Sequence, residues 1–320
     1  MFIESLSSAL KFMDTTLNRK LAIILTICLS FALSFGLREM LIKEKVEAKT
    51  ESKLEAKIKE KPQPYQRIAS FSPALTEILF ALNLGEQVIA VTSYCKYPDQ
   101  VLDKDRYPNI GTLFDTKFEK LAKLKPDLVI LEKTSVNQQS KLDDMGLNSL
   151  NVELKRLDQI TKVIAQIAQK TGQSDQLAKS LNQQRQEIIK EHRSKKDLSV
   201  LIMVDANFIA GANTMYHEMI KDLNCENAYK GNIPYPQLSA EGLIHMNPDV
   251  IIQLEPELGN DLEKQSAIIN KWHQKKQLNA VKKNQVYVLA KPYVSIPGPR
   301  FILTMRDIAS CVEKARAVYE

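Results

Sequence analysis

The order of short β-rich runs and helical patterns predicts an α/β protein with two lobes joined by a long rigid helix. Strands and helices alternate over residues 66–156 and again over 197–320, a pattern typical of parallel sheets with helical crossovers. Between these regions, residues 157–196 contain helical patterns and no plausible strand. We therefore predict two Rossmann-like lobes and a helical backbone, preceded by an N-terminal hydrophobic segment.

The hydrophobic segment at residues 21–37 carries no charge. At about 1.5 Å per residue, such a helix is just long enough to span the apolar core of a bilayer. Arg19 and Lys20 precede it, which favours residues 1–20 as a cytoplasmic leader. A small-x-small pattern at 32–34 leaves cleavage open, whereas acidic residues in the leader favour a retained anchor. Either fate places the remainder of the chain on the extracytoplasmic side.

A charged spacer follows at residues 38–65, where Lys and Glu alternate with few large apolar side chains. Opposite charges three or four residues apart support a solvated helix, although no apolar face exists to dock it. Pro62 and Pro64 end this pattern. We interpret the segment as a spacer that separates the folded part from the membrane.

The N-terminal lobe is predicted at residues 66–156. Ser72 suits a helix N-cap, and Pro73 suits the first helical position. The helix ends near Gly85. The remaining elements are assigned from hydrophobic runs and from turn residues such as Pro126. The predicted strands are 67–71, 87–93, 128–131 and 152–154, and the predicted helices are 73–81 and 118–124.

The inter-lobe backbone is predicted at residues 157–196. Apolar residues at Ile160, Ile164 and Ile167 lie on one helical face, Gly172 interrupts the pattern, and a second helix follows over 175–193. The α/β alternation then resumes in the C-terminal lobe, residues 197–320. Its predicted strands are 198–204, 250–254 and 286–289, and its helices are 215–223 and 301–319.

Several function classes are disfavoured by the composition and by missing motifs. The net charge of +6 arises from dispersed lysines interleaved with acidic residues, so the chain does not resemble a nucleic-acid-binding protein. We find no GxGxxG, P-loop, HExxH or GxSxG motif and expect neither catalytic residues nor a bound cofactor. No metal site is expected, because the histidines are far apart in sequence: His192, His217, His245 and His273.

Short motifs follow one another in a characteristic order in both predicted lobes. They are segments 67–73 with 76–78, 91–98, 118–121, 124–129, 234–239 with Glu241, and 247–250. This ordered set resembles the helical-backbone, or class III, periplasmic metal-chelate-binding proteins, which serve importers of cobalamin, ferric siderophores and haem. The similarity covers about residues 66 to 320 and is greatest to the cobalamin-binding members.

This resemblance implies a non-enzymatic substrate-binding protein of an ABC importer, located in the periplasm or on the extracytoplasmic face of the inner membrane. Its implied partners are a permease dimer with its ATPase subunits and a metal-chelate ligand. Glu119 and Glu241 match the glutamates that dock each lobe onto permease arginines, and paired carboxylates suit such bonds. Cys225 and Cys311 match a disulfide of the C-terminal lobe, whereas the state of Cys95 stays open.

The ligand is expected in the cleft between the lobes, and a corrinoid is favoured over a ferric siderophore or haem. Aromatic walls and a few polar groups suit a large chelate. Arg300 offers a cation for an anionic siderophore or a haem propionate, while a purely structural role for this arginine stays open. Leu113 and Glu132 occupy positions that hold tryptophans in the cobalamin-binding members. The predicted ligand-binding residues are Pro73, Tyr94, Phe114, Phe208, Tyr235, Tyr293 and Arg300.

Two alternatives of other classes stay open at this stage. A chelate-processing enzyme or a metal-insertion chaperone can be built on a similar fold, and turnover of a chelate would favour that reading. A membrane-tethered sensor is the other alternative, although the leader at residues 1–20 is short for a signalling domain. The identity of the chelate and the oligomeric state are not determined by the sequence.

Overall fold

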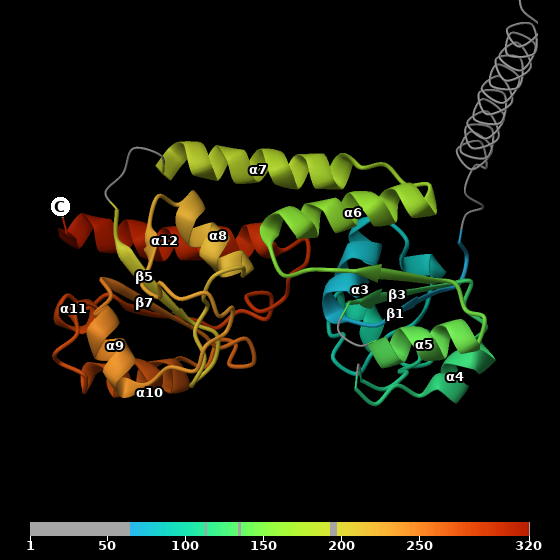
Figure 1. Ribbon diagram of the computed structural model, residues 1–320, viewed down its shortest axis with the longest axis horizontal. Coiled ribbons are helices and arrows are strands. Elements are labelled where there is room, and N and C mark those ends of the chain that lie inside the picture. Colours follow the sequence, from blue (N-terminus) through green and yellow to red (C-terminus); the bar gives the residue numbers. More distant parts are fainter. Residues whose placement is uncertain (1–64, 113, 134–135, 193–196, 320) are drawn as a thin grey trace, which may run out of the picture. The chain divides into compact units, whose positions relative to one another are not determined.

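The computed structural model describes residues 65–112, 114–133, 136–192 and 197–319, which belong to one compact unit, Pro62–Glu320 (Figure 1). The predicted leader, the hydrophobic segment 21–37 and all of the spacer except Tyr65 lie outside these residues. Among the helices that are described, none combines the length and the apolar character needed to cross a membrane.

The N-terminal lobe is built on a four-stranded parallel sheet with the strand order β2-β1-β3-β4. Its strands are β1 (Ile68–Ser70), β2 (Val88–Ala90), β3 (Leu128–Glu132) and β4 (Ser149–Val152). Its helices are α3 (Pro73–Ala81), α4 (Phe118–Leu124) and α5 (Val136–Asp144), with 3₁₀ turns at Gly85–Gln87 and Asp99–Leu102. The predicted cap is confirmed, because the Ser72 hydroxyl accepts a hydrogen bond from the Leu75 N–H.

The C-terminal lobe repeats this topology with the strand order β6-β5-β7-β8, again entirely parallel. Its strands are β5 (Ser199–Met203), β6 (Glu226–Asn227), β7 (Val250–Leu254) and β8 (Val286–Leu289). Its helices are α8 (Met215–Asp222), α9 (Ala240–Met246), α10 (Leu262–His273), α11 (Asn279–Lys282) and α12 (Phe301–Tyr319). The predicted α/β class with two lobes is thereby confirmed.

The same local motif occurs in both lobes, between α4 and β3 and between α9 and β7. Lys125 after α4 and Asn247 after α9 adopt left-handed backbone conformations, and each is followed by Pro-Asp. Asp127 accepts hydrogen bonds from the backbone N–H groups that precede β1, and Asp249 accepts one from the first N–H of β5. Each aspartate therefore ties the start of one central strand to its neighbour.

Two helices, α6 (Leu157–Thr171) and α7 (Gln176–His192), form the backbone between the lobes (Figure 1). The predicted interruption is confirmed, since Gly172 caps α6 with a φ of 73°. The link is therefore a helix pair, in which α6 packs against α7, rather than a single long helix. At the N-terminus of α6, the Leu157 N–H donates to Glu218 Oε2 of α8, at 2.9 Å.

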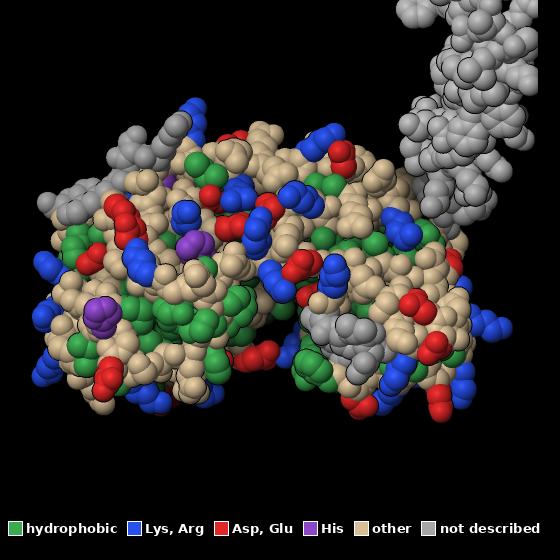
Figure 2. All heavy atoms as spheres, in the orientation of Figure 1, with side chains coloured by type: hydrophobic (Ala, Val, Ile, Leu, Met, Phe, Trp, Pro, Cys, Tyr) green, Lys and Arg blue, Asp and Glu red, His purple; other side chains and the backbone are tan. Residues whose placement is uncertain are grey.

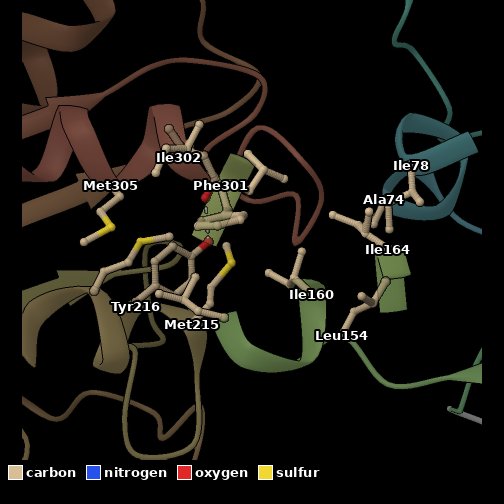
Figure 3. Packing of buried hydrophobic residues seen from close by; sticks show 14 of the residues in the cluster. Ala74, Ile78, Leu154, Ile160, Ile164, Met215, Tyr216, Phe301, Ile302 and Met305 are labelled. Atoms are coloured by element: carbon tan, nitrogen blue, oxygen red, sulfur yellow. Dashed lines mark hydrogen bonds between the residues drawn. The ribbon is translucent and has the colours of Figure 1, made fainter. Parts of the chain in front are cut away.

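The apolar core is continuous from one lobe to the other through α6. Figure 3 shows Ile164 on the side of Ala74 and Ile78, which belong to α3 of the N-terminal lobe. Ile160, one turn earlier, lies toward the side on which Phe301 of the C-terminal lobe packs. All five side chains are buried, and each large one contributes about 1.5–3 kcal/mol of burial free energy. The lobes are consequently held by shared packing as well as by the chain.

Candidate functional site

The carboxyl ends of the strands in both lobes meet at the boundary between the lobes. Lys96, in the loop that follows β2, donates to Glu257, in the loop that follows β7, with an Nζ–Oε2 distance of 2.8 Å. Figure 2 shows a hollow between the lobes and hydrophobic side chains gathered beside it on the C-terminal lobe. Ligands of α/β proteins bind outside the carboxyl ends of parallel strands and between domains. This boundary is therefore the candidate ligand site.

A buried ion pair joins the lobes at this boundary. Arg300 donates from Nε to Glu77 Oε2 at 2.9 Å and from Nη2 to Oε1 at 2.6 Å. The Glu77 side chain is 3% exposed and that of Arg300 is 17% exposed. Burial raises the pKa of Glu77 above its ordinary value, and the neighbouring Arg300 opposes this shift. The guanidinium predicted to contact an anionic ligand is thus directed at a carboxylate of the other lobe.

The predicted aromatic residues lie in loops at the facing strand ends. Tyr94 follows β2, Phe208 follows β5 and Tyr235 follows β6, and all three side chains are exposed. Exposed aromatic rings on loops supported by a rigid sheet suit the recognition of a large apolar ligand. Phe114 is 92% exposed in the segment between β2 and α4, while Pro73 is half-buried at the first position of α3.

Tyr293, predicted as a ligand contact, lies in the loop between β8 and α12 and is engaged inside the protein. Its hydroxyl donates to Asp307 Oδ2 at 2.8 Å, and the Arg300 guanidinium lies 5.5 Å from its ring centroid. Burial raises the pKa of Tyr293 to about 12, so the side chain is a neutral phenol at neutral pH. Its structural contacts therefore involve the same Arg300 that pairs with Glu77.

Glu132 lies at the end of β3, where the cobalamin-binding members are expected to carry a tryptophan. Burial raises the pKa of Glu132, and a hydrogen bond from Ser72 opposes the shift. The site edge consequently holds a carboxyl group in place of an aromatic wall at this point. Leu113, at the second such position, lies outside the described residues.

Two residues of the boundary are absent from the site predicted from the sequence. Tyr97 lies with its ring beneath Arg300, and Glu77 is the partner of that arginine. A signal for Glu77 was present, because it is the single charge in the largely apolar helix PALTEILFA and a buried carboxylate requires a partner. No local signal identified Tyr97, since Arg300, which covers its ring, is distant in the sequence.

Glu119 and Glu241 occupy equivalent positions in the two lobes. Each is the second residue of a seven-residue helix, α4 or α9, and each side chain is exposed in the first turn. In Figure 1 both helices lie on the side of their lobes away from α6 and α7. The repeated topology thus presents one carboxylate per lobe on that side.

The disulfide implied by the resemblance is not formed, which corrects that expectation. Cys225 and Cys311 are both buried free thiols, as is Cys95. The Cys225 Sγ lies 3.4 Å from the guanidinium of the buried Arg316 and 3.7 Å from the Leu223 carbonyl oxygen. The Cys225 thiol therefore donates to the Leu223 carbonyl, while its sulfur accepts a hydrogen bond from Arg316. Burial raises the pKa of Cys311 to about 12 and keeps it protonated.

Cys95 and His192 both make polar contacts inside the protein. Cys95 Sγ lies 3.2 Å from the Thr76 hydroxyl and 3.3 Å from that of Thr92. His192 is buried, with its Nδ1 2.9 Å from a Glu313 carboxylate oxygen. Within the described ranges, no three His, Cys, Asp or Glu side chains are grouped so as to hold a metal ion.

Comparison with known proteins places this fold in a family. Residues 68–293 match the family described as periplasmic binding protein. The ABC transporter substrate-binding lipoprotein YvrC of Bacillus subtilis (strain 168) is 28% identical over 261 residues, which cover 77% of this chain and 80% of the relative. The vitamin B12-binding protein of Vibrio cholerae is 26% identical over 264 residues, covering 80% and 92%.

Solved structures agree with this assignment at the level of the fold. The periplasmic vitamin B12-binding protein BtuF of Vibrio cholerae superposes with a TM-score of 0.67 at 23% identity, covering 79% of this chain and 98% of that structure. The periplasmic haem-binding protein RhuT of Roseiflexus sp. RS-1 gives 0.65 at 22% identity, covering 79% and 99%. These relatives are binding proteins and not enzymes, as the sequence predicted. The chain belongs to the periplasmic binding protein family and is a substrate-binding protein of the ABC-transporter type.

Proposed function

We propose that this protein captures a metal chelate between its lobes and delivers it to an ABC permease dimer with its ATPase subunits. One observation carries the proposal: loops at the carboxyl ends of both parallel sheets meet at one boundary and expose aromatic side chains there. Tyr94 belongs to the N-terminal lobe, and Phe208 and Tyr235 belong to the C-terminal lobe. Rings from both lobes suit a ligand too large for either lobe alone.

A corrinoid is the ligand we favour, with a ferric siderophore or haem as the alternative. Relatives named as vitamin B12-binding proteins support the corrinoid. Two observations support the alternative of a ferric siderophore or haem. Glu132 stands at a position expected to hold tryptophan, and the fold is similar to that of haem-binding proteins. Amide groups at the edge of a corrinoid would offer donors to a carboxylate.

Titration of the purified full chain in mild detergent tests the proposal. Cyanocobalamin, haemin and ferric siderophores are added in turn, with absorbance and calorimetry as readouts. We expect saturable one-to-one binding of cyanocobalamin. The single tryptophan, Trp272, is buried in α10 with its N–H bonded to Gln253, so its fluorescence gives a control for global unfolding. Failure of every chelate to bind would refute the function.

Glu119 and Glu241 are proposed to dock the two lobes onto arginines of the permease. The support is their equivalent, exposed placement on helices that share one side of the molecule. Carboxylates held at a defined separation can accept charge-assisted hydrogen bonds from two subunits of a permease dimer.

The docking test replaces both glutamates by alanine and measures uptake in cells alongside affinity for the ligand. We expect uptake to be lost while affinity is unchanged. Glu263→Ala is the matched control, because Glu263 is also an exposed second residue of a helix, α10. Weakened ligand binding by the double variant, or equal loss of uptake with the control, would contradict the assignment.

We also propose that the folded unit lies on the extracytoplasmic side of the inner membrane, through the segment at residues 21–37. The support is the uncharged length of that segment and the basic pair before it. Protease added to spheroplasts should degrade the folded unit, and sequencing of the mature N-terminus should distinguish a retained anchor from a cleaved signal. Protection from the protease would contradict this location.

A further inference from the structure

The ring of Tyr97 is covered on one side by the inter-lobe arginine. The guanidinium carbon of Arg300 lies 3.7 Å from the centroid of the Tyr97 ring, a distance typical of close stacking. Tyr97 belongs to the loop after β2, whereas Arg300 lies at the start of α12 in the other lobe. Tyr97 nevertheless remains 45% exposed, so part of its ring is open at the boundary where the strand ends meet.

The arginine that covers Tyr97 is itself held on several sides. Its bidentate bonds to the buried Glu77 set the plane of the guanidinium. The Tyr293 ring lies 5.5 Å from the guanidinium, and its hydroxyl is bonded to Asp307. A ring supported in this way loses little conformational entropy when a ligand packs against it.

We propose that Tyr97 contacts the ligand, that Arg300 and Glu77 position its ring, and that the chelate presents a flat aromatic or conjugated surface to it. This inference rests on the proposed function of chelate capture. The Glu77–Arg300 pair carries no net charge, so its attraction for an anionic ligand is weak. Within this cluster the open part of the Tyr97 ring is the surface that can meet a ligand, and tyrosine rings recognise other flat π-surfaces by stacking. Chelates built only from aliphatic hydroxamates lack such a surface.

Ligand binding by the full chain in mild detergent tests the contact, with cyanocobalamin, haemin and ferrioxamine B as probes. The wild-type protein should bind one of the two conjugated probes more tightly than ferrioxamine B, an aliphatic hydroxamate chelate. Loss of the stacked ring in Tyr97→Leu should weaken binding of that probe about five- to tenfold. Tyr97→Phe keeps the ring and should bind within about twofold of the wild type.

The positioning role is tested with Arg300→Met, which removes the support of the ring. It should weaken the conjugated probe as much as Tyr97→Leu does, and combining the two should add little, because both changes remove one interaction. Arg185→Met is the matched control, since Arg185 forms a similarly buried pair with Asp222 away from Tyr97. The control should leave the preference among probes unchanged.

Several outcomes would overturn the inference. Wild-type affinity in Tyr97→Leu, or ferrioxamine B bound as tightly as the conjugated probes, refutes the ligand contact while leaving chelate capture intact. Failure of all probes to bind the wild type refutes the proposed function and the contact together. In that case hydrogen exchange in the loop 91–97 tests whether Arg300 positions the Tyr97 ring. Exchange should be faster in Arg300→Met than in the wild type and unchanged in Arg185→Met. Unchanged exchange in Arg300→Met refutes the support as well.

Discussion

Removal of one partner from the Glu77–Arg300 pair should destabilise the folded unit far more than removal of one partner from Lys96–Glu257. Both pairs join the same two lobes, at similar N–O distances of 2.6 and 2.8 Å. Their side-chain exposures differ sharply, at 3% and 17% for the first pair and 81% and 63% for Glu257 and Lys96. A buried charge that loses its partner costs about 3–5 kcal/mol, whereas an exposed pair contributes about 0–1 kcal/mol.

The pair as a unit should nevertheless add little stability over apolar side chains. Burial is the larger influence on Glu77 and raises its pKa even beside Arg300, so desolvation outweighs the attraction between the charges. The double variant Glu77→Leu/Arg300→Met should therefore recover to within about 1 kcal/mol of the wild type. Glu77→Leu alone should lower the free energy of unfolding by about 3–5 kcal/mol, because it leaves the buried guanidinium without its carboxylate.

Urea denaturation of the fragment 62–320 measures these differences in the free energy of unfolding. A loss of 3 kcal/mol would lower the midpoint by about 1 M at a slope of about 3 kcal/mol/M. In Arg300→Met, the Glu77 carboxyl keeps a pKa raised by burial. The variant should therefore regain stability as the pH falls toward the ordinary pKa of 4.5 and lose it as the pH rises through the raised value. Single variants that stay within 1 kcal/mol of the wild type would refute the reasoning.

Three further predictions follow from the core and from titrating groups. The fragment 62–320 should show slow thiol labelling when native and three reactive thiols after denaturation, Cys95, Cys225 and Cys311; a single thiol would indicate the disulfide. Ile164→Ala, at a fully buried position of α6, should cost about 2–5 kcal/mol in calorimetry, and a loss below 1 kcal/mol would contradict the shared core. Burial lowers the pKa of His217, so stability should fall as the pH drops below the ordinary value of 6.5, and His217→Gln should flatten that dependence in denaturation curves.

Elements with strong local signals were predicted closely. The strand Val250–Leu254 and the helices Phe118–Leu124 and Phe301–Tyr319 have the bounds expected from the sequence. Uninterrupted apolar runs mark buried parallel strands, and Pro residues or left-handed caps end the adjacent helices. Such signals act within a few residues, so the chain carries them without reference to its tertiary contacts.

Elements with weak local signals were misplaced or missed. The fourth strand was expected at 152–154 and is found at Ser149–Val152, where its half-buried residues give no clear pattern. The helix Val136–Asp144 was not predicted, because its sequence is largely polar. The strand Glu226–Asn227 is too short to be recognised from its composition. For these segments, pairing with a neighbouring strand or packing on the sheet decides the conformation.

The sequence by itself determined the α/β class, the two lobes, the interruption at Gly172 and the aromatic loops, because each depends on periodicity or on residues adjacent in the chain. Only the tertiary structure decided how the site is supported. Arg300, for which the sequence left a ligand contact and a structural role open, pairs with Glu77, 223 residues away, and covers Tyr97. Cys225 and Cys311 likewise remain separate thiols. Such pairings depend on which side chains share a desolvated space, and that is settled only when the lobes pack together.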